Sequence, residues 1–245
     1  MQQPIIDGVL MTKTVLITGV GKRIGLYLAN AFIQQGWQVI GTYRSHYPSI
    51  DALAESGADL YCCDFTDNLQ IQHFIEKVLA AYPQLDCVIH NASLWLPDNA
   101  DLANSDIMAT MMQVHVSAPY QINLAVAPLL QAAEQKSNII HITDYVAEKG
   151  SKKHIAYAAS KAAMENMSLS FASLLAPKVK VNSIAPALIC FNEGDSEQYQ
   201  QKARNKSLMQ QVGGEHEMWD AIQYLLCSHY ITGRSLPLDG GRHLK

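Results

Sequence analysis

The 245-residue sequence lacks the marks of membrane, nucleic-acid-binding and metal proteins. No apolar run reaches the roughly 18 residues that are needed to span a membrane. Lysine and arginine form no run longer than a pair, and the formal net charge of −4 argues against a nucleic-acid-binding face. The five cysteines show no C-x-x-C spacing and the nine histidines show no metal-ligand spacing. We therefore expect no membrane span, no nucleic-acid partner and no metal site.

The N-terminal residues also lack the pattern of a secretion signal. No basic residue precedes their apolar part, as a signal peptide would require. We expect residues 1–12 to be an N-terminal extension or a tag remnant, and residues 13–245 to form the folded domain. Three of the cysteines lie in apolar segments typical of buried strands, which favours reduced thiols and a cytoplasmic protein.

Apolar, strand-like segments alternate with longer segments of helical periodicity along the chain. The expected strands are 14–17, 38–43, 59–63, 86–90, 138–143, 180–184 and 235–238, and the expected helices are 24–35, 68–82, 105–130, 155–175 and 215–226. Strands that are apolar on both faces, with helices between them, predict one parallel sheet covered on both sides. The polar stretch 192–214 is too long for an ordinary connection and is a candidate substrate loop.

The segments that follow the first two strands predict a dinucleotide site. Residues 18–25, Thr-Gly-Val-Gly-Lys-Arg-Ile-Gly, place glycines where backbone N–H groups can approach a pyrophosphate at a helix N-terminus. The second strand is followed by Arg44 and Ser45, with no carboxylate before Asp51. NAD enzymes place an acid there for the ribose 2′-hydroxyl, whereas a guanidinium suits a 2′-phosphate. NADPH is therefore the expected cofactor, unless Arg44 is an ordinary solvent-exposed loop residue.

Tyr157 and Lys161 lie four residues apart in an alanine-rich segment that predicts a helix. Both then share one helix face, so the ammonium group is expected to lower the pKa of the phenol toward the working pH. Tyr145 and Lys149 have the same spacing, but they follow a strand directly and precede Gly150. We expect no helix that holds this second pair in register.

These motifs resemble those of the short-chain dehydrogenase/reductase family and, within it, the pteridine reductases. Tyr-x-x-x-Lys at 157–161 is the motif of the whole family, whereas the T-G-x-x-K-R-x-G turn and Asn-Ala-Ser at 91–93 have the pteridine-reductase form. The resemblance runs from about residue 13 to 241. His-Asn-Ala-Ser, Thr-Asp-Tyr and the ending Leu-Asp-Gly-Gly-Arg-His are most similar to bacterial dihydromonapterin reductases. The resemblance implies an α/β fold: a single Rossmann-type, doubly wound parallel sheet of seven strands in the order 3-2-1-4-5-6-7, flanked by helices.

The resemblance also implies a set of cofactor-binding residues at the ends of the strands. They are Gly19, Lys22, Arg23, Ile24, Arg44, Ser45, Asp64, Phe65, Asn91, Ala92, Tyr157, Lys161, Pro186 and Leu188. Arg23 replaces the middle glycine of the wider family and would add a positive charge near Arg44. Lys161 would hold the nicotinamide ribose.

Asp144 stands thirteen residues before Tyr157, where most of the family has a serine that binds the substrate's carbonyl oxygen. A carboxylate would repel the oxyanion that forms when a ketone is reduced, but it suits a nitrogen that must gain a proton. The expected catalytic residues are therefore Asp144, Tyr157 and Lys161. Alternatively, Thr143 does the work of the serine and Asp144 only caps a loop.

The expected substrate-binding residues are Ser93, Trp95, Asp144 and Tyr157. Trp95 matches the aromatic residue that stacks on the pterin in pteridine reductases, although a buried core tryptophan fits the composition almost as well. His115 replaces a helix asparagine of the family's proton relay. A histidine titrates near neutrality, so its part in that relay stays open.

The predicted activity is NADPH-dependent reduction of a 7,8-dihydropterin to the tetrahydropterin, with the hydride going to C6 and the proton of Tyr157 to N5. The resemblance implies dihydromonapterin as the main substrate, dihydrofolate or dihydrobiopterin as weaker ones, and a homotetramer. Two alternatives stay open. One is a carbonyl or 3-oxoacyl thioester reductase on the same fold, and the other is a nucleotide-sensing regulator that has lost catalysis. The preferred pterin side chain and the physiological direction are not determined by the sequence.

Overall fold

A computed structural model of the protein describes residues 5–6, 9–10, 12–98 and 104–245. Its centre is a seven-stranded parallel sheet in the order β5-β4-β3-β6-β7-β8-β9. The strands are β3 (Thr14–Ile17), β4 (Gln38–Tyr43), β5 (Asp59–Cys62), β6 (Cys87–His90), β7 (Ser137–Ile142), β8 (Val179–Pro186) and β9 (Ser235–Leu238). Counted from β3, this is the order 3-2-1-4-5-6-7, so the predicted fold is confirmed.

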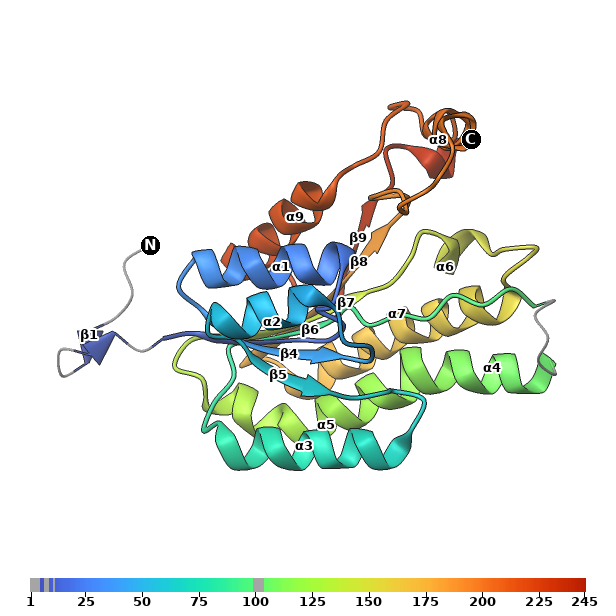
Figure 1. Ribbon diagram of the computed structural model, residues 1–245. Helices are drawn as coiled ribbons and strands as arrows, with labels where there is room; N and C mark the ends of the chain where they lie inside the picture. The colour runs from blue at the N-terminus through green and yellow to red at the C-terminus, as the bar shows by residue number, and fades with distance from the viewer. Residues whose placement is uncertain (1–4, 7–8, 11, 99–103) are drawn as a thin grey trace.

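Helices cover both faces of the sheet (Figure 1). One layer contains α1 (Arg23–Gln34), α2 (Pro48–Glu55) and α9 (Glu215–Cys227), and the other contains α3 (Asn68–Ala81), α5 (Ala118–Ala132) and α7 (Ile155–Leu175). Side chains alternate between the two faces of each strand, so each layer has its own apolar core. Ile17 and Ile89 belong to the core under α1, whereas Leu16 and Val88 belong to the core under α5. A slip of one residue would exchange these sets, which fixes the register.

The predicted helix 105–130 is divided in three. It consists of α4 (Asn104–Met112), a π-helical turn η1 (Gln113–Ser117) and α5. A π-turn inserts a residue into the helical ladder and often marks a functional site. Here it carries His115, whose buried ring lies against Tyr157 of α7.

Several short elements were not predicted. They are α2, α6 (Val146–Lys149), α8 (Glu197–Arg204) and the 3-10 turn η2 (Arg242–Leu244). Such short segments carry too few apolar positions for a clear periodic signal. The turn α6 corrects one expectation, because Tyr145 and Lys149 do lie at the two ends of a helical turn. The long polar stretch 192–214 contains α8.

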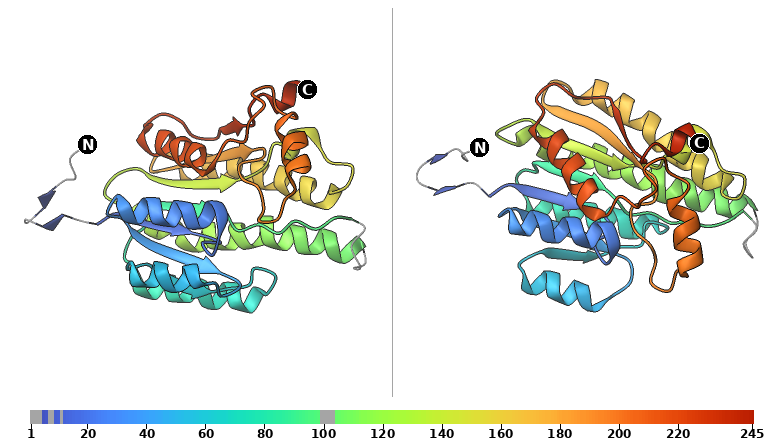
Figure 2. Two further views of the ribbon diagram at one scale, coloured as in Figure 1. Left: turned by 45° about the horizontal axis from the view of Figure 1, so that its top comes forward. Right: turned by 90° about the horizontal axis from the view of Figure 1, so that it is seen from above.

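The N-terminal residues that the structure describes form a small hairpin, in which β1 (Ile5–Ile6) runs antiparallel to β2 (Val9–Leu10). Figure 2 shows this hairpin at the end of the molecule away from α8 and the C-terminus. Residues 1–4, 7–8 and 11 of the predicted extension 1–12 lie outside the described residues, and the boundary at residue 13 stays a prediction. No helix in the described ranges is long and apolar enough to cross a membrane.

Candidate active site

A cavity of about 730 Å³ opens at the carboxyl ends of the strands. Its volume is typical of a small-molecule or cofactor site. Parallel strands end at the same edge of the sheet, so residues that are far apart in the chain meet there. Every residue that we predicted to bind cofactor or substrate lines this one cavity.

The glycine-rich turn after β3 is built for close backbone approach. Gly19 has a φ of +75°, and a Cβ atom there would lie 3.0 Å from the Cα atom of Ala92. A Cβ atom on Gly25 would overlap the carbonyl oxygen of Gly19. Only glycine therefore fits at either position. The turn leads into the N-terminus of α1, where free N–H groups favour a phosphate, so the residues present fit a dinucleotide.

Arg23 adopts a left-handed backbone conformation with a φ of +54°. That conformation costs roughly 1–2 kcal/mol for a residue with a Cβ atom, and glycine adopts it freely. Arg23 stands where the wider family has a glycine. A glycine takes this left-handed conformation without that cost. The guanidinium group of Arg23 donates to the Sγ and carbonyl oxygen of Cys190, both at 3.4 Å, beyond the end of β8. This contact directs Arg23 toward the end of β8, whereas Arg44 follows β4 on the other side of β3, and a joint action of the two charges stays a prediction.

Arg44 is exposed on the nucleotide side of the cavity, directly after β4. Asp51, the first carboxylate that follows, instead contacts the Nε2 of His46 at 3.0 Å. In the described part of the chain, no carboxylate lies within 4 Å of the Arg44 guanidinium group. Its charge is therefore available to a bound anion.

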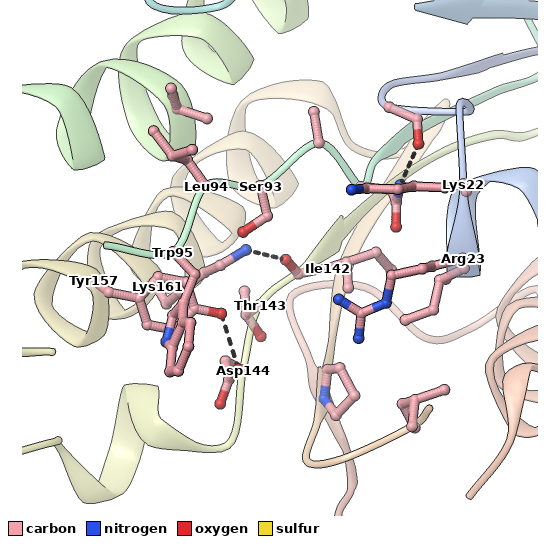
Figure 3. A pocket seen from close by; sticks show the side chains of 18 of the residues that line it. Lys22, Arg23, Ser93, Leu94, Trp95, Ile142, Thr143, Asp144, Tyr157 and Lys161 are labelled. Carbon is pink, nitrogen blue, oxygen red and sulfur yellow. Dashed lines mark hydrogen bonds between the residues drawn. The ribbon is translucent and has the colours of Figure 1, made fainter. Parts of the chain in front are cut away.

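The three predicted catalytic residues meet at the floor of the cavity (Figure 3). The hydroxyl of Tyr157 donates to Oδ2 of Asp144 at 2.9 Å, and the Nζ of Lys161 donates to the carbonyl oxygen of Ile142 at 2.8 Å. Thr143 donates its hydroxyl to the carbonyl oxygen of Ile184 at 3.1 Å. That bond favours Asp144, not Thr143, as the residue that stands in the place of the family serine.

Burial is the main cause of the pKa shifts of Asp144, Tyr157 and Lys161. It raises the pKa of Asp144, against the opposing effects of the Val146 N–H, Tyr157 and Lys161. It also raises the pKa of Tyr157 well above its usual value, and the neighbouring Asp144 carboxylate adds to this effect. The expected lowering of the Tyr157 pKa by Lys161 is therefore wrong for this geometry, and the phenol keeps its proton. Burial lowers the pKa of Lys161 to about 8.

His115 connects the two walls of the cavity. Its Nε2 contacts the Oγ of Ser93 at 2.9 Å and accepts from the N–H of Leu94 at 3.2 Å, and its Nδ1 lies 2.8 Å from the Oγ of Ser160. Ser160 in turn donates to the carbonyl oxygen of Tyr157 at 2.7 Å. Burial lowers the pKa of His115 to about 2. The ring is thus a neutral support, and the expectation that it titrates near neutrality is wrong.

Trp95 is not a core residue. Its side chain is 64% exposed, lines the cavity, and stacks on the ring of His154 with centroids 4.0 Å apart and planes at 21°. An exposed indole that is held flat by a second ring offers its free face to a planar ligand. The core interpretation is therefore wrong, and stacking on the substrate stays a prediction.

Sequence reasoning did not assign three residues of the site. His154 supports Trp95, Ser160 supports His115, and Arg242 lies over the ring of Tyr145 with its Cζ 4.5 Å from the centroid. Ser160 lies within the Tyr-x-x-x-Lys motif, one helical turn from Tyr157, which was an available signal. Arg242 belongs to the C-terminal motif, but its position over Tyr145 depends on how the chain end folds back, and the stacking of His154 on Trp95 likewise depends on the fold.

Comparison with known proteins gives the family. A family model described as enoyl-(acyl carrier protein) reductase matches residues 19–243. A protein of Escherichia coli O6:H1 named dihydromonapterin reductase is 52% identical over 239 residues, which cover 97% of this chain and all of the relative. The chain belongs to the short-chain dehydrogenase/reductase family. A Shigella boydii protein with the same name is 53% identical over 232 residues, covering 94% of this chain and 97% of the relative.

Two solved structures in complex with NADP share the fold. The FolM alternative dihydrofolate reductase 1 of Brucella canis, complexed with NADP, superposes with a TM-score of 0.85 at 23% identity, covering 95% of this chain and 94% of its own. The NADP complex of RhlG from Pseudomonas aeruginosa has a TM-score of 0.84 at 22% identity, covering 95% of this chain and 97% of its own. In the described ranges, no three His, Cys, Asp or Glu side chains gather as a metal site.

Proposed function

We propose that the protein catalyses the NADPH-dependent reduction of a 7,8-dihydropterin to the tetrahydropterin. The observation that carries this proposal is the hydrogen bond between Tyr157 and Asp144 at the floor of the cavity. The dihydromonapterin reductase relatives, which align over nearly the whole chain, support the same activity.

The carboxyl group of Asp144 decides between a pterin and a ketone. Reduction of a ketone places a developing negative charge on oxygen, and a carboxylate beside it would raise the barrier. Reduction of a dihydropterin at C6 requires a proton at N5. Its ring also carries N–H donors, which a carboxylate can accept. Asp144 therefore suits the pterin ring.

The residues of the site divide the reaction between them. NADPH, when bound, supplies the hydride that reduces C6 of the pterin. Tyr157 supplies the proton to N5, because burial and Asp144 keep its phenol protonated. Asp144 assists this transfer, since its own pKa is raised by burial and it shares a hydrogen bond with the phenol. Lys161 holds the nicotinamide ribose from the helix α7, and Trp95 stacks on the pterin.

NADPH is held at the opposite end of the same cavity. The turn between Gly19 and Gly25 takes the pyrophosphate, and Arg44 with Ser45 takes the 2′-phosphate. Arg44 is exposed, lies within the cavity lining and has no carboxylate partner within 4 Å among the described residues, which supports this role. Cofactor selectivity should then depend on the charge at residue 44.

Three further proposals concern the protein in its cell. We propose dihydromonapterin as the preferred substrate, with dihydrofolate and dihydrobiopterin weaker. We propose a cytoplasmic location, which the five free cysteines support. We also propose a homotetramer, with exposed apolar side chains on α5 and α7 at its interfaces, among them Tyr120, Leu124 and Leu169. Light scattering on the purified protein tests the last of these.

A steady-state assay tests the activity. NADPH oxidation should be measured with dihydromonapterin, dihydrobiopterin and dihydrofolate beside a panel of ketones and a 3-oxoacyl thioester. We expect turnover with the dihydropterins and little with the carbonyl compounds. Turnover of a ketone alone would establish a carbonyl reductase. Binding of NADPH without turnover of any substrate in the panel would favour a nucleotide-sensing regulator.

A further inference from the structure

Four cationic side chains gather at the substrate end of the cavity, and the proposed mechanism uses none of them. Lys152 and Lys153 precede α7, Lys206 follows α8, Arg242 lies in η2, and all four line the cavity. Partial burial lowers the pKa of Lys206, and the positive charges of Arg242, Lys202 and Lys153 lower it further. Three separate segments of the chain thus bring like charges together. We call these four residues the cationic rim.

The cationic rim is held in place by contacts between these segments. Arg242 rests on the ring of Tyr145, with its Cζ 4.5 Å from the centroid. The Nζ of Lys245 donates to the carbonyl oxygen of Asn205 at 2.6 Å, next to Lys206, and Lys149 of α6 donates to the carbonyl oxygen of Lys245 at 2.8 Å. The C-terminal turn η2 is therefore tied both to α6 and to the residues after α8.

Nearby carboxylates are bonded elsewhere. Asp239 accepts from the N–H of Gly241 and from the N–H and ring of His243. Asp98 accepts from the N–H groups of Ile155 and Ala156 at the start of α7. Over the part of the chain that the structure describes, each carboxylate ion pair within 4 Å involves a histidine and none involves a lysine or arginine. Among the described residues, none of the four rim cations is therefore in an ion pair within 4 Å.

We propose that the cationic rim binds an anionic group at the far end of the substrate's C6 substituent, so that an added terminal anion strengthens the binding of a given dihydropterin. This inference rests on the proposed function. With the pterin ring between Trp95 and Asp144, a substituent that leads out of the cavity meets the rim, since Lys152 and Lys153 directly precede the His154 that supports Trp95. Ammonium and guanidinium groups recognise a phosphate monoester and a chain of glutamate carboxylates by the same charge-assisted hydrogen bonds.

Four substrates separate these possibilities. They are a 7,8-dihydropterin with a neutral trihydroxypropyl group at C6, its terminal phosphate monoester, 7,8-dihydrofolate and dihydrofolate triglutamate. We expect the phosphate monoester to exceed its neutral parent, or the triglutamate to exceed dihydrofolate, in kcat/KM by about tenfold at low salt. Raising NaCl from about 50 to about 300 mM should reduce that ratio, because exposed charges are then screened. The series with the higher ratio identifies the source of the anion.

Single charge changes locate the effect. Lys206→Gln and Arg242→Gln should each lower the ratio of kcat/KM between the anionic and the neutral substrate by roughly three- to fivefold. Lys77→Gln is the matched control, because Lys77 is exposed on α3, away from the cavity lining. It should leave the ratio and the activity unchanged. Thermal midpoints of all three variants check that the fold is intact, and the ratio cancels any common loss of active protein.

The outcomes distinguish a failure of the inference about the cationic rim from a failure of the proposed function. If the neutral dihydropterin is reduced and the anionic ones are no better, the rim does not select anions and the proposed function stands. If the anionic preference is present but both rim variants keep it, other residues cause it and the inference is wrong. If no dihydropterin oxidises NADPH, the proposed function and the inference fail together.

Discussion

The two ends of the active-site cavity are built in different ways. At the nucleotide end, the turn 18–25 and Arg44 directly follow β3 and β4, and Asp64 lies two residues after β5, so the sheet itself positions them. At the substrate end, much of the wall comes from α6, the segment after α8 and η2, which pair with no strand. Side-chain contacts such as Arg242 on Tyr145 hold these pieces together. The substrate end can therefore change with the ligand while the fold is retained.

Electrostatics separates the two ends as well. At the nucleotide end, the exposed guanidinium group of Arg44 is available to a phosphate. The affinity for NADPH should therefore depend on that one charge. The catalytic floor at the substrate end is enclosed, and there burial moves the pKa values of Asp144, Tyr157 and Lys161. A substitution at the floor should thus affect the chemical step, whereas one at the nucleotide end should affect cofactor affinity.

The largest effect is expected at the catalytic floor, from Asp144→Ser. Loss of the carboxyl group should lower kcat for the dihydropterin by roughly 10²–10⁴-fold, the usual range for a lost general acid. The dissociation constant of NADPH should change little, because the nucleotide is held at the other end. Steady-state kinetics and a fluorescence titration with NADPH measure the two quantities separately.

Asp144→Asn separates charge from shape at the same position. The amide keeps hydrogen bonds but cannot transfer a proton, so kcat should fall nearly as far as with serine. Retention of most of the wild-type kcat would mean that Asp144 only anchors the pterin, and that proton delivery belongs to Tyr157 and water. Weak new activity of the serine variant on an activated ketone would strengthen the comparison with other short-chain reductases.

This contrast also explains what the sequence could predict. The strands and the edge of the sheet that carries the site were predictable, because strand periodicity and glycine turns are local signals and parallel strands gather their ends. The strand order and most of the cavity residues followed from the family resemblance. The direction of Arg23 toward Cys190 was not predictable, since it depends on a left-handed residue and on the loop after β8. The raised pKa of Tyr157 was not predictable either, because it follows from burial and from Asp144 in space. The short elements α6, α8 and η2 lack a periodic signal.

At the nucleotide end, Arg44→Asp should weaken NADPH binding by roughly 10- to 100-fold. A hydrogen bond to a charged group contributes about 1.5–3 kcal/mol, and the new carboxylate adds repulsion. NADH binding should fall much less or improve, because the ribose 2′-hydroxyl can donate to the aspartate. Lys77→Asp on α3 carries the same charge change away from the cavity and serves as the control. Equal losses for NADPH and NADH would show that Arg44 does not contact the 2′-phosphate.

A smaller effect is expected for Trp95→Ala at the substrate end. Stacking of a planar ring on an aromatic side chain contributes about 1–3 kcal/mol, so the KM for the dihydropterin should rise about tenfold. The thermal midpoint should change little, because Trp95 is 64% exposed. Trp219→Ala is the matched control, since Trp219 packs edge-on against the buried Phe32 with centroids 5.0 Å apart. It should lower the midpoint and leave KM unchanged, and the reverse pattern would contradict stacking by Trp95.

The two ends share a buried support beneath the sheet. His90, which precedes Asn91 at the nucleotide end, and His141, which precedes Ile142 at the catalytic floor, stack with centroids 5.0 Å apart. Asn123 bridges their rings at 2.7 and 3.1 Å. Burial lowers the pKa of His90 to about 4 and the pKa of His141 well below its usual value. Both rings are neutral in the folded protein.

The last prediction is a loss of stability in mild acid that reaches both ends together. In the unfolded chain these histidines bind a proton below a pKa of about 6.5, whereas in the folded protein they do not. Stability is therefore unaffected above that pH and falls as the pH decreases toward the folded pKa values, by at most about 1.4 kcal/mol per pH unit for each ring. Urea unfolding between about pH 7 and pH 5 measures the slope. His90→Gln should reduce this slope, and a flat profile in the unmodified protein would mean that the pair is charged in the folded state.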